Sequence, residues 1–135
     1  MKKIVLTGAM LLLAALGLGA QDFRLEWPAD SIPASATKIL EQRIGQMLEA
    51  GGLKLSDDAS AKPLSINYDI TSRMETPGSM SQVALTIDLI INSGEVSETF
   101  PLKGVGDNEA DAWTRAVKMF LPRSKAAQTF VLKLK

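Results

Sequence analysis

The chain has 135 residues, carries 15 basic and 15 acidic side chains, and contains neither histidine nor cysteine. These two absences exclude Ser-His and Cys-His nucleophilic catalysis and every zinc site made of imidazole or thiolate. A serine–lysine or carboxylate-only mechanism stays formally open, but nothing at motif spacing supports one. We therefore expect a protein that is not an enzyme, with no catalytic, cofactor-binding or metal-ligating residues.

Residues 1–20 have the three-part pattern of a secretory signal peptide. Two lysines precede an almost unbroken apolar run over residues 4–16, and small residues follow over 17–20. We expect cleavage before Ala20 or Gln21. An uncleaved membrane anchor is the alternative, but a spanning helix needs about 20 apolar residues and this run is shorter. The pattern predicts a periplasmic or secreted protein.

Residues 21–135 are expected to form a single domain, an ordinary size for one core. Without the two lysines of the signal, 13 basic residues face 15 acidic ones, a formal charge of −2. We interpret these charges as mixed along the chain without blocks of one sign, which predicts neither a nucleic-acid partner nor an anionic-membrane footprint. No cysteine is present for a lipid anchor, so no stable membrane insertion is expected after cleavage.

The first part of the domain predicts a strand, a helix and a short strand. Residues 22–27 alternate polar and apolar, with Phe23, Leu25 and Trp27 on one side, as in a half-buried strand. Ser35 is expected to cap a helix that ends at the glycines 51–52. The inward helix positions recur at spacings of three and four: Ala36, Ile39, Leu40, Ile44, Met47 and Leu48. A short strand over 53–55 and a polar loop over 56–62 follow.

Three further strands are predicted from period-two alternation. Residues 64–74 have one apolar face, made of Leu64, Ile66, Tyr68 and Ile70. Residues 82–92 are apolar on one face and partly apolar on the other, which favours a central strand. The turn at 92–95 predicts an antiparallel hairpin with residues 96–103. Pro101 favours an edge position for that last strand, because proline cannot donate to a ladder.

The end of the chain predicts two helices. Gly104-Val105-Gly106 is expected to be a corner where the backbone passes close to another element. Asp107 or Asn108 should cap a helix that Pro122 ends. Its inward stripe is expected to be Ala110, Trp113, Ala116, Val117, Phe120 and Leu121. For residues 124–135 we favour a helix capped by Ser124, with a strand as the alternative.

Together these elements predict an α+β fold. We expect a two-layer sandwich in which an antiparallel three- to four-stranded sheet carries the helices on one face. The fourth strand would be the N-terminal one.

Two polar clusters have possible ligand-binding interpretations. The Gly-Val-Gly segment before a helix N-terminus resembles an anion cradle, but it lacks the remaining residues of the dinucleotide and P-loop motifs. We favour a structural corner with a helix cap. The acidic residues Asp57, Asp58, Asp107, Glu109 and Asp111 could form a calcium site, but their spacing matches no EF-hand loop and calcium is not expected.

Apolar residues near turns and termini leave two interpretations open. Met74 and Met80 flank a Pro-Gly turn and could belong to a partner surface or to the core. For Phe23 and Trp27 the strand period favours the core. Strand edges at residues 96–100 or 23–27 could also accept a partner strand.

Residues 102–110, LKGVGDNEA, resemble a motif of small secreted proteins of Gram-negative bacteria, mostly uncharacterised. In these proteins a β-hairpin ends in "KGVG.NE..A" and enters a helix. The likeness continues through Ala112, Ala116 and Val117 and includes the helix and GGL segment over 39–53. The chain is more distantly similar to the α/β domain shared by the curli-secretion lipoprotein, the lipoprotein activators of penicillin-binding proteins, and the N-terminal domain of the Tol periplasmic protein.

This resemblance implies a cell-envelope accessory domain that acts by protein–protein contacts with an envelope partner, not by catalysis. The chain departs from the lipoprotein members because it lacks the lipobox cysteine, and it has no segment corresponding to a pore-forming hairpin. Only the architectural role of Gly104 and Gly106 is carried over. The alternative function is binding of a small ligand or an envelope polymer, such as peptidoglycan or another glycan, in a groove between sheet and helices.

Overall fold

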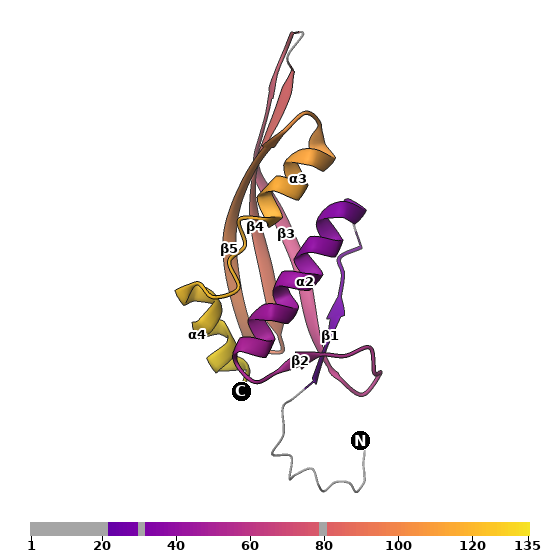
Figure 1. Ribbon diagram of the computed structural model, residues 1–135, viewed down its shortest axis with the longest axis vertical. Helices are drawn as coiled ribbons and strands as arrows, with labels where there is room; N and C mark the ends of the chain where they lie inside the picture. The colour runs from indigo at the N-terminus through magenta and orange to yellow at the C-terminus, as the bar shows by residue number, and fades with distance from the viewer. Residues whose placement is uncertain (1–21, 30–31, 79–80) are drawn as a thin grey trace, which may run out of the picture.

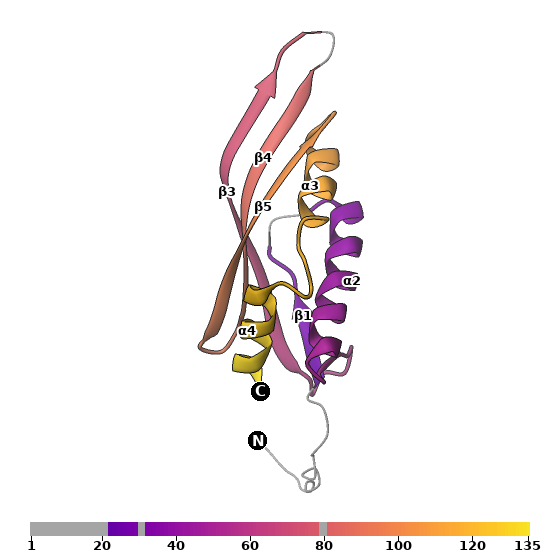
Figure 2. The same cartoon turned by 60° about the vertical axis from the view of Figure 1, so that its left-hand side comes forward.

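The structure, a computed structural model, describes residues 22–29, 32–78 and 81–135. The predicted signal peptide, its cleavage point and Met80 lie outside these residues. One five-stranded sheet, in the order β2-β1-β3-β4-β5, carries three helices on one face (Figures 1 and 2). The elements are β1 (Asp22–Glu26), α2 (Ala34–Ala50), β2 (Lys54–Leu55), β3 (Lys62–Thr76), β4 (Gln82–Ser93), β5 (Val96–Gly106), α3 (Glu109–Val117) and α4 (Lys125–Leu134).

The predicted α+β class is confirmed, but the antiparallel three- to four-stranded sheet is wrong. The sheet has five strands and is mixed, because β1 runs parallel to both of its neighbours, β2 and β3. Alternation of apolar residues does not distinguish parallel from antiparallel pairing. The helix α2 supplies the long crossover that parallel pairing of β1 and β2 requires.

The strand β4 is central, as predicted from its apolar faces. Its helix-facing side chains are all buried: Val83, Leu85, Ile87, Leu89 and Ile91. It pairs antiparallel with β3 and β5 along its whole length. The turn between β4 and β5 contains Gly94 at φ 61°, a conformation that glycine adopts without strain. As Pro101 predicted, β5 is an edge strand.

The Gly-Val-Gly segment belongs to β5, so the predicted corner is wrong, while the predicted close approach is confirmed. Gly104 and Gly106 face α3 with almost no space between the two backbones. A Cβ atom on Gly106 would lie 2.6 Å from the Ala112 nitrogen, and one on Gly104 would lie 2.5 Å from the Ala116 nitrogen. A strand interior disfavours glycine, and this contact is the reason that glycine is needed here.

The cap of α3 was predicted correctly and its end was not. Asn108 is the N-cap, since its side chain accepts a hydrogen bond from the Asp111 N–H at 2.8 Å. The helix stops at Val117 and does not reach Pro122. The predicted inward stripe is wrong at Ala110, in the first turn of α3, and at Leu121, beyond its end, which are both exposed. The buried positions are Ala112, Trp113, Ala116 and Val117 on the helix and Phe120 after it.

Ser35 does not cap α2, which begins with Pro33 in the N-cap position. The Ser35 hydroxyl instead makes a hydrogen bond of 2.8 Å with the Thr114 hydroxyl, which joins α2 to α3. At the other end of the chain, Ser124 caps α4 by accepting from the Ala127 N–H at 3.2 Å. The predicted helix is confirmed and the alternative strand is wrong.

Replacing Gly104 by alanine tests the close packing of α3 on β5. We expect Gly104→Ala to lower the free energy of unfolding by about 1–3 kcal/mol, because the added methyl group meets backbone atoms that cannot move aside locally. Urea denaturation of the purified protein measures this change.

The matched control is Gly45→Ala on α2, where the nearest atom to a new Cβ is Leu55 Cδ1 at 3.5 Å. That change should be neutral or should stabilise the protein by up to about 1 kcal/mol, since alanine is the better helix former. Equal stability of the two variants would contradict the packing described.

Candidate functional site

The residues considered for anion binding form hydrogen bonds and an ion pair with one another at the start of α3. The Asp107 N–H donates to Asp111 Oδ2 at 3.1 Å, and the Asp111 N–H donates to Asn108. Arg115 Nε lies 3.4 Å from the same Asp111 oxygen. These contacts support the structural interpretation, a helix cap with its own counter-charge.

The five acidic residues weighed as a calcium site are not brought together. Asp57 and Asp58 lie in the loop before β3, at the opposite end of the molecule from the start of α3 (Figure 1). The Ser60 backbone N–H donates to Asp58 Oδ1 at 3.0 Å and lowers the pKa of that carboxyl below its ordinary value. Among residues 22–29, 32–78 and 81–135, no three or more acidic side chains are placed to hold a metal ion.

The first exposed surface is the tip of the β3–β4 hairpin, which projects past α3 and past the end of β5 (Figures 1 and 2). On the face away from the helices, Met74 pairs with Ala84, and Ala84 pairs with Val105. We call these three residues the apolar row. Met74 is 68% exposed and Val105 is 47% exposed, so the row crosses three strands in contact with solvent.

A β-bulge explains why Met74 belongs to the outer face. Up to Ile70 the even-numbered residues of β3 face the helices, and continued alternation would have placed Met74 there too. The register shifts between Ile70 and Ser72, so that Arg73 lies opposite the buried Leu85. An extra residue in a strand reverses the faces beyond it. The question left open for Met74 is answered in favour of exposure.

No described strand pairs with the edge of β3 beside the apolar row. On the side away from β4, β3 pairs with β1 only as far as Ser65, so residues 66–76 have no described strand there. The predicted edge over residues 23–27 is only partly closed: β1 lies between β2 and β3, but β2 pairs with Asp22 and Phe23 alone, so no described strand pairs with residues 24–27 on that side.

Ion pairs fix the hairpin tip from its helix-facing side. Arg73 donates to Glu109 of α3 at 2.9 Å and to Glu75 at 3.0 Å. The hydrogen bond to Glu109, followed by the contacts with Glu75, raises the pKa of the Arg73 guanidinium above its ordinary value. The opposite face, with the apolar row, is left accessible.

The second exposed surface is built on the connector between α3 and α4, residues 118–124. Phe120 points inward and packs edge-on against Phe100, with ring centroids 4.9 Å apart. Arg43 of α2 donates to the Phe120 carbonyl at 3.1 Å, and the Gln128 side chain donates to the Arg123 carbonyl at 3.0 Å. These contacts hold the connector from both flanking helices.

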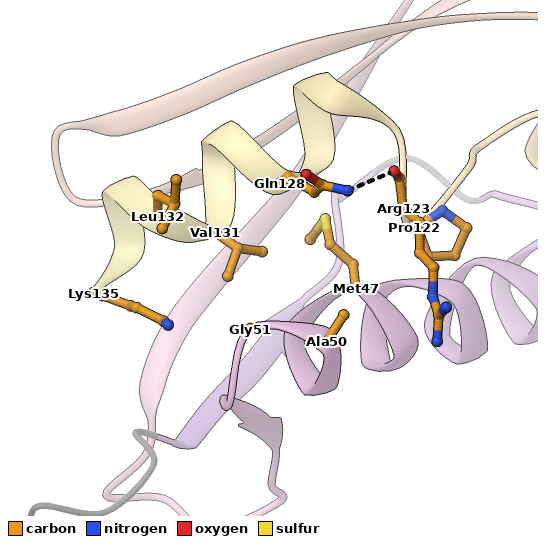
Figure 3. A pocket seen from close by; sticks show the side chains of 9 residues that line it. All are labelled: Met47, Ala50, Gly51, Pro122, Arg123, Gln128, Val131, Leu132 and Lys135. Carbon is orange, nitrogen blue, oxygen red and sulfur yellow. Dashed lines mark hydrogen bonds between the residues drawn. The ribbon is translucent and has the colours of Figure 1, made fainter.

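The connector and α4 display apolar side chains outward. Met119, Leu121 and Leu132 are 58–68% exposed. Three adjoining hollows surround them, with volumes of about 520, 730 and 180 Å³. The first, between the end of α2 and α4, is shown in Figure 3. It shares Pro122 and Arg123 with the second, which in turn shares Leu121 with the third.

The charged side chains of the connector and α4 are all positive, which corrects the interpretation of the sequence as evenly mixed. Residues 22–111 contain all 15 acidic residues and seven basic ones, whereas residues 112–135 contain six basic residues and no acidic one. Counting charge by segment would have found this surface from the sequence. We call it the basic surface, and it comprises Lys118, Met119, Leu121, Arg123, Lys125, Leu132, Lys133 and Lys135.

The cations of the basic surface are not neutralised by nearby carboxylates. The ion pairs of the described residues involve Arg24, Arg73 and Arg115, each within 4.0 Å of an acidic side chain. Lys118, Arg123 and the lysines of α4 make none. Glu49, at the rim of the second hollow, is the acidic residue that lines these hollows.

Comparison with known proteins gives no family. No protein-family model and no curated protein matches the chain. Among solved structures, a minor lipoprotein from Acinetobacter baumannii is 22% identical and aligns over 84% of this chain and 88% of its own, with a TM-score of 0.35. A PelC dodecamer from Paraburkholderia phytofirmans is 11% identical over 77% and 88%, with a TM-score of 0.39. A lipoprotein from Caulobacter crescentus is 7% identical over 83% of both chains, with a TM-score of 0.30.

The first and third of these likenesses are to bacterial lipoproteins, and at such TM-scores none of the three carries an argument. The resemblance to secreted proteins with the KGVG motif therefore stays a prediction. In the part of the chain that the structure describes, no helix is long and apolar enough to cross a membrane.

Removing the Arg43 donor tests how the connector is held. We expect Arg43→Met to lower the free energy of unfolding by about 1–2 kcal/mol, because the partly buried Phe120 carbonyl loses a charged donor while the apolar stem is kept. Lys38→Met, an exposed position on the same helix, should change stability by less than about 0.5 kcal/mol. Urea denaturation compares the two, and equal effects would contradict the anchoring role of Arg43.

Proposed function

We propose that the chain is a non-enzymatic accessory domain of the bacterial cell envelope that binds a protein partner through the tip of the β3–β4 hairpin. The signal-like pattern of residues 1–20 supports the envelope location. The complete absence of histidine and cysteine supports a role without catalysis.

The observation that carries this proposal is the apolar row next to the open edge of β3. An unpaired strand edge offers a line of backbone donors and acceptors to an incoming strand. Main-chain hydrogen bonds then supply affinity, and contacts with adjacent side chains supply specificity. Met74 and Val105 are large exposed apolar residues on one face. A partner strand on the β3 edge would lie beside Met74, and a partner that also covers the outer face of the row would bury Val105, two strands away on β5.

The geometry also suggests which partner chemistry fits. On the outer face of the tip the row is surrounded mostly by uncharged polar residues, Ser72, Thr76, Gln82 and Thr86, and Lys103, opposite Thr86, adds one cation. The charged residues Arg73 and Glu75 are held on the other face. The expected partner is therefore a protein that presents an extended segment with small polar and apolar side chains.

Site-specific crosslinking tests the proposed contact. A photoreactive amino acid is placed at Met74 in the full chain, expressed in the source bacterium, and irradiated cells are analysed by mass spectrometry. The matched control carries the same amino acid at Thr99, an exposed position on the same sheet face of β5, opposite Ile90. We expect one discrete protein adduct from position 74 and none of it from position 99.

A second change separates binding from proximity. Val105→Asp in the Met74 probe should reduce the adduct by about tenfold or more, since a charge would be placed inside the apolar contact. Binding at the apolar row would be contradicted if Val105→Asp left the adduct yield unchanged. It would also be contradicted if both probe positions gave the same adducts.

A further inference from the structure

We propose that the basic surface docks the protein onto an anionic lipid membrane, with its cations on lipid phosphates and its apolar side chains between the headgroups. This surface lies on the α3–α4 connector and α4, apart from the hairpin tip (Figure 2). The inference goes beyond the proposed protein partner and does not depend on it.

Charge complementarity supplies the first argument. Lys118, Arg123, Lys125, Lys133 and Lys135 lie within 18 residues of sequence that contain no acid. None of them is within 4.0 Å of a described carboxylate. Each Lys or Arg near an anionic membrane strengthens binding by about fivefold. Residues 22–111 carry a net charge of −8, so an anionic membrane attracts residues 118–135 in preference to the rest of the chain.

The outward face of α4 combines charge with an apolar residue. Lys125, Thr129 and Leu132 are spaced by four and three residues, so they share one side of the helix. All three are exposed, while Ala127, Phe130, Val131 and Leu134 fill the core on the opposite side. Leu132 can therefore enter a lipid interface without any loss of packing inside the protein.

The connector adds two more apolar side chains in the same setting. Met119 and Leu121 are exposed on either side of the buried Phe120, and Lys118 and Arg123 flank them in sequence. Arg43 and Gln128 hold the connector, so these side chains are presented without an ordering step. Apolar side chains between cations are the pattern of a helix or loop that lies in a membrane interface.

The shape of the surface favours lipid over a soluble anion. A free phosphate would be recognised by converging donors and would gain nothing from Met119, Leu121 and Leu132. These three side chains project outward around hollows that are open to solvent. Lipid phosphates with acyl chains behind them satisfy both the cations and the projecting apolar groups.

Vesicle flotation tests this proposal with protein purified from cells that express the full chain. We expect binding to vesicles in which about a third of the lipid is phosphatidylglycerol and weak or no binding to phosphatidylcholine alone. Raising sodium chloride to about 0.5 M should release the protein, because exposed charges are then screened. Inorganic phosphate should compete no better than chloride at the same ionic strength.

Matched variants assign the binding to this surface. The triple variant Arg123→Gln, Lys125→Gln, Lys133→Gln should bind on the order of 100-fold more weakly. The control variant Lys38→Gln, Lys54→Gln, Lys62→Gln makes the same change of net charge at exposed lysines elsewhere. Its vesicle affinity should fall by no more than about threefold, because these lysines act only through long-range electrostatics that salt screens. Thermal melting checks that both variants are folded.

A second pair of variants tests the apolar contribution. Leu132→Ser should weaken vesicle binding by about fivefold to tenfold, whereas Met74→Ser on the hairpin tip should have no effect. The proposal would be overturned by equal binding to both kinds of vesicle or by equal loss of binding in the two triple variants. It would also be overturned if inorganic phosphate, but not chloride at the same ionic strength, displaced the protein from the vesicles. A protein that binds an acidic polypeptide but does not bind the vesicles would overturn it as well.

Discussion

The contact between the backbones of α3 and β5 sets the rest of the structure. Because Gly104 and Gly106 have no side chains, Ala112 and Ala116 of α3 approach the strand directly. The helix then lies low enough on the sheet for Trp113 to pack edge-on against Tyr68, with ring centroids 4.8 Å apart. The path of the chain after Val117, and so the place of the connector and α4, follows from that position.

Much of this fold could be predicted because local chemistry and tertiary structure agree. Alternating apolar residues located β3, β4 and β5, and the side chains of Asn108 and Ser124 identified two helix starts. The parallel pairing of β1 could not be predicted, because it depends on where α2 returns the chain and not on the strand itself. The bulge at Thr71 could not be predicted either. It reverses which residues of β3 face the helices, but no residue type near it marks its position.

For the candidate site, too, the sequence pointed to individual residues but not to how they are arranged in space. The sequence drew attention to Met74 and to the glycines, but it could not decide whether they served packing or binding. The basic surface was overlooked because the net charge of the mature chain is close to zero. Its signal is the distribution of charge, with every acidic residue before position 112. A domain with one partner surface on its hairpin tip and another on α4 could bridge a membrane and a protein.

The hairpin tip and the basic surface are expected to act separately. Hydrogen exchange of the protein with and without phosphatidylglycerol vesicles, read by mass spectrometry, measures this directly. We expect slower exchange confined to residues 118–135, with no change over residues 71–84 of the hairpin. Slower exchange in the hairpin, or unchanged exchange throughout residues 118–135, would contradict this expectation.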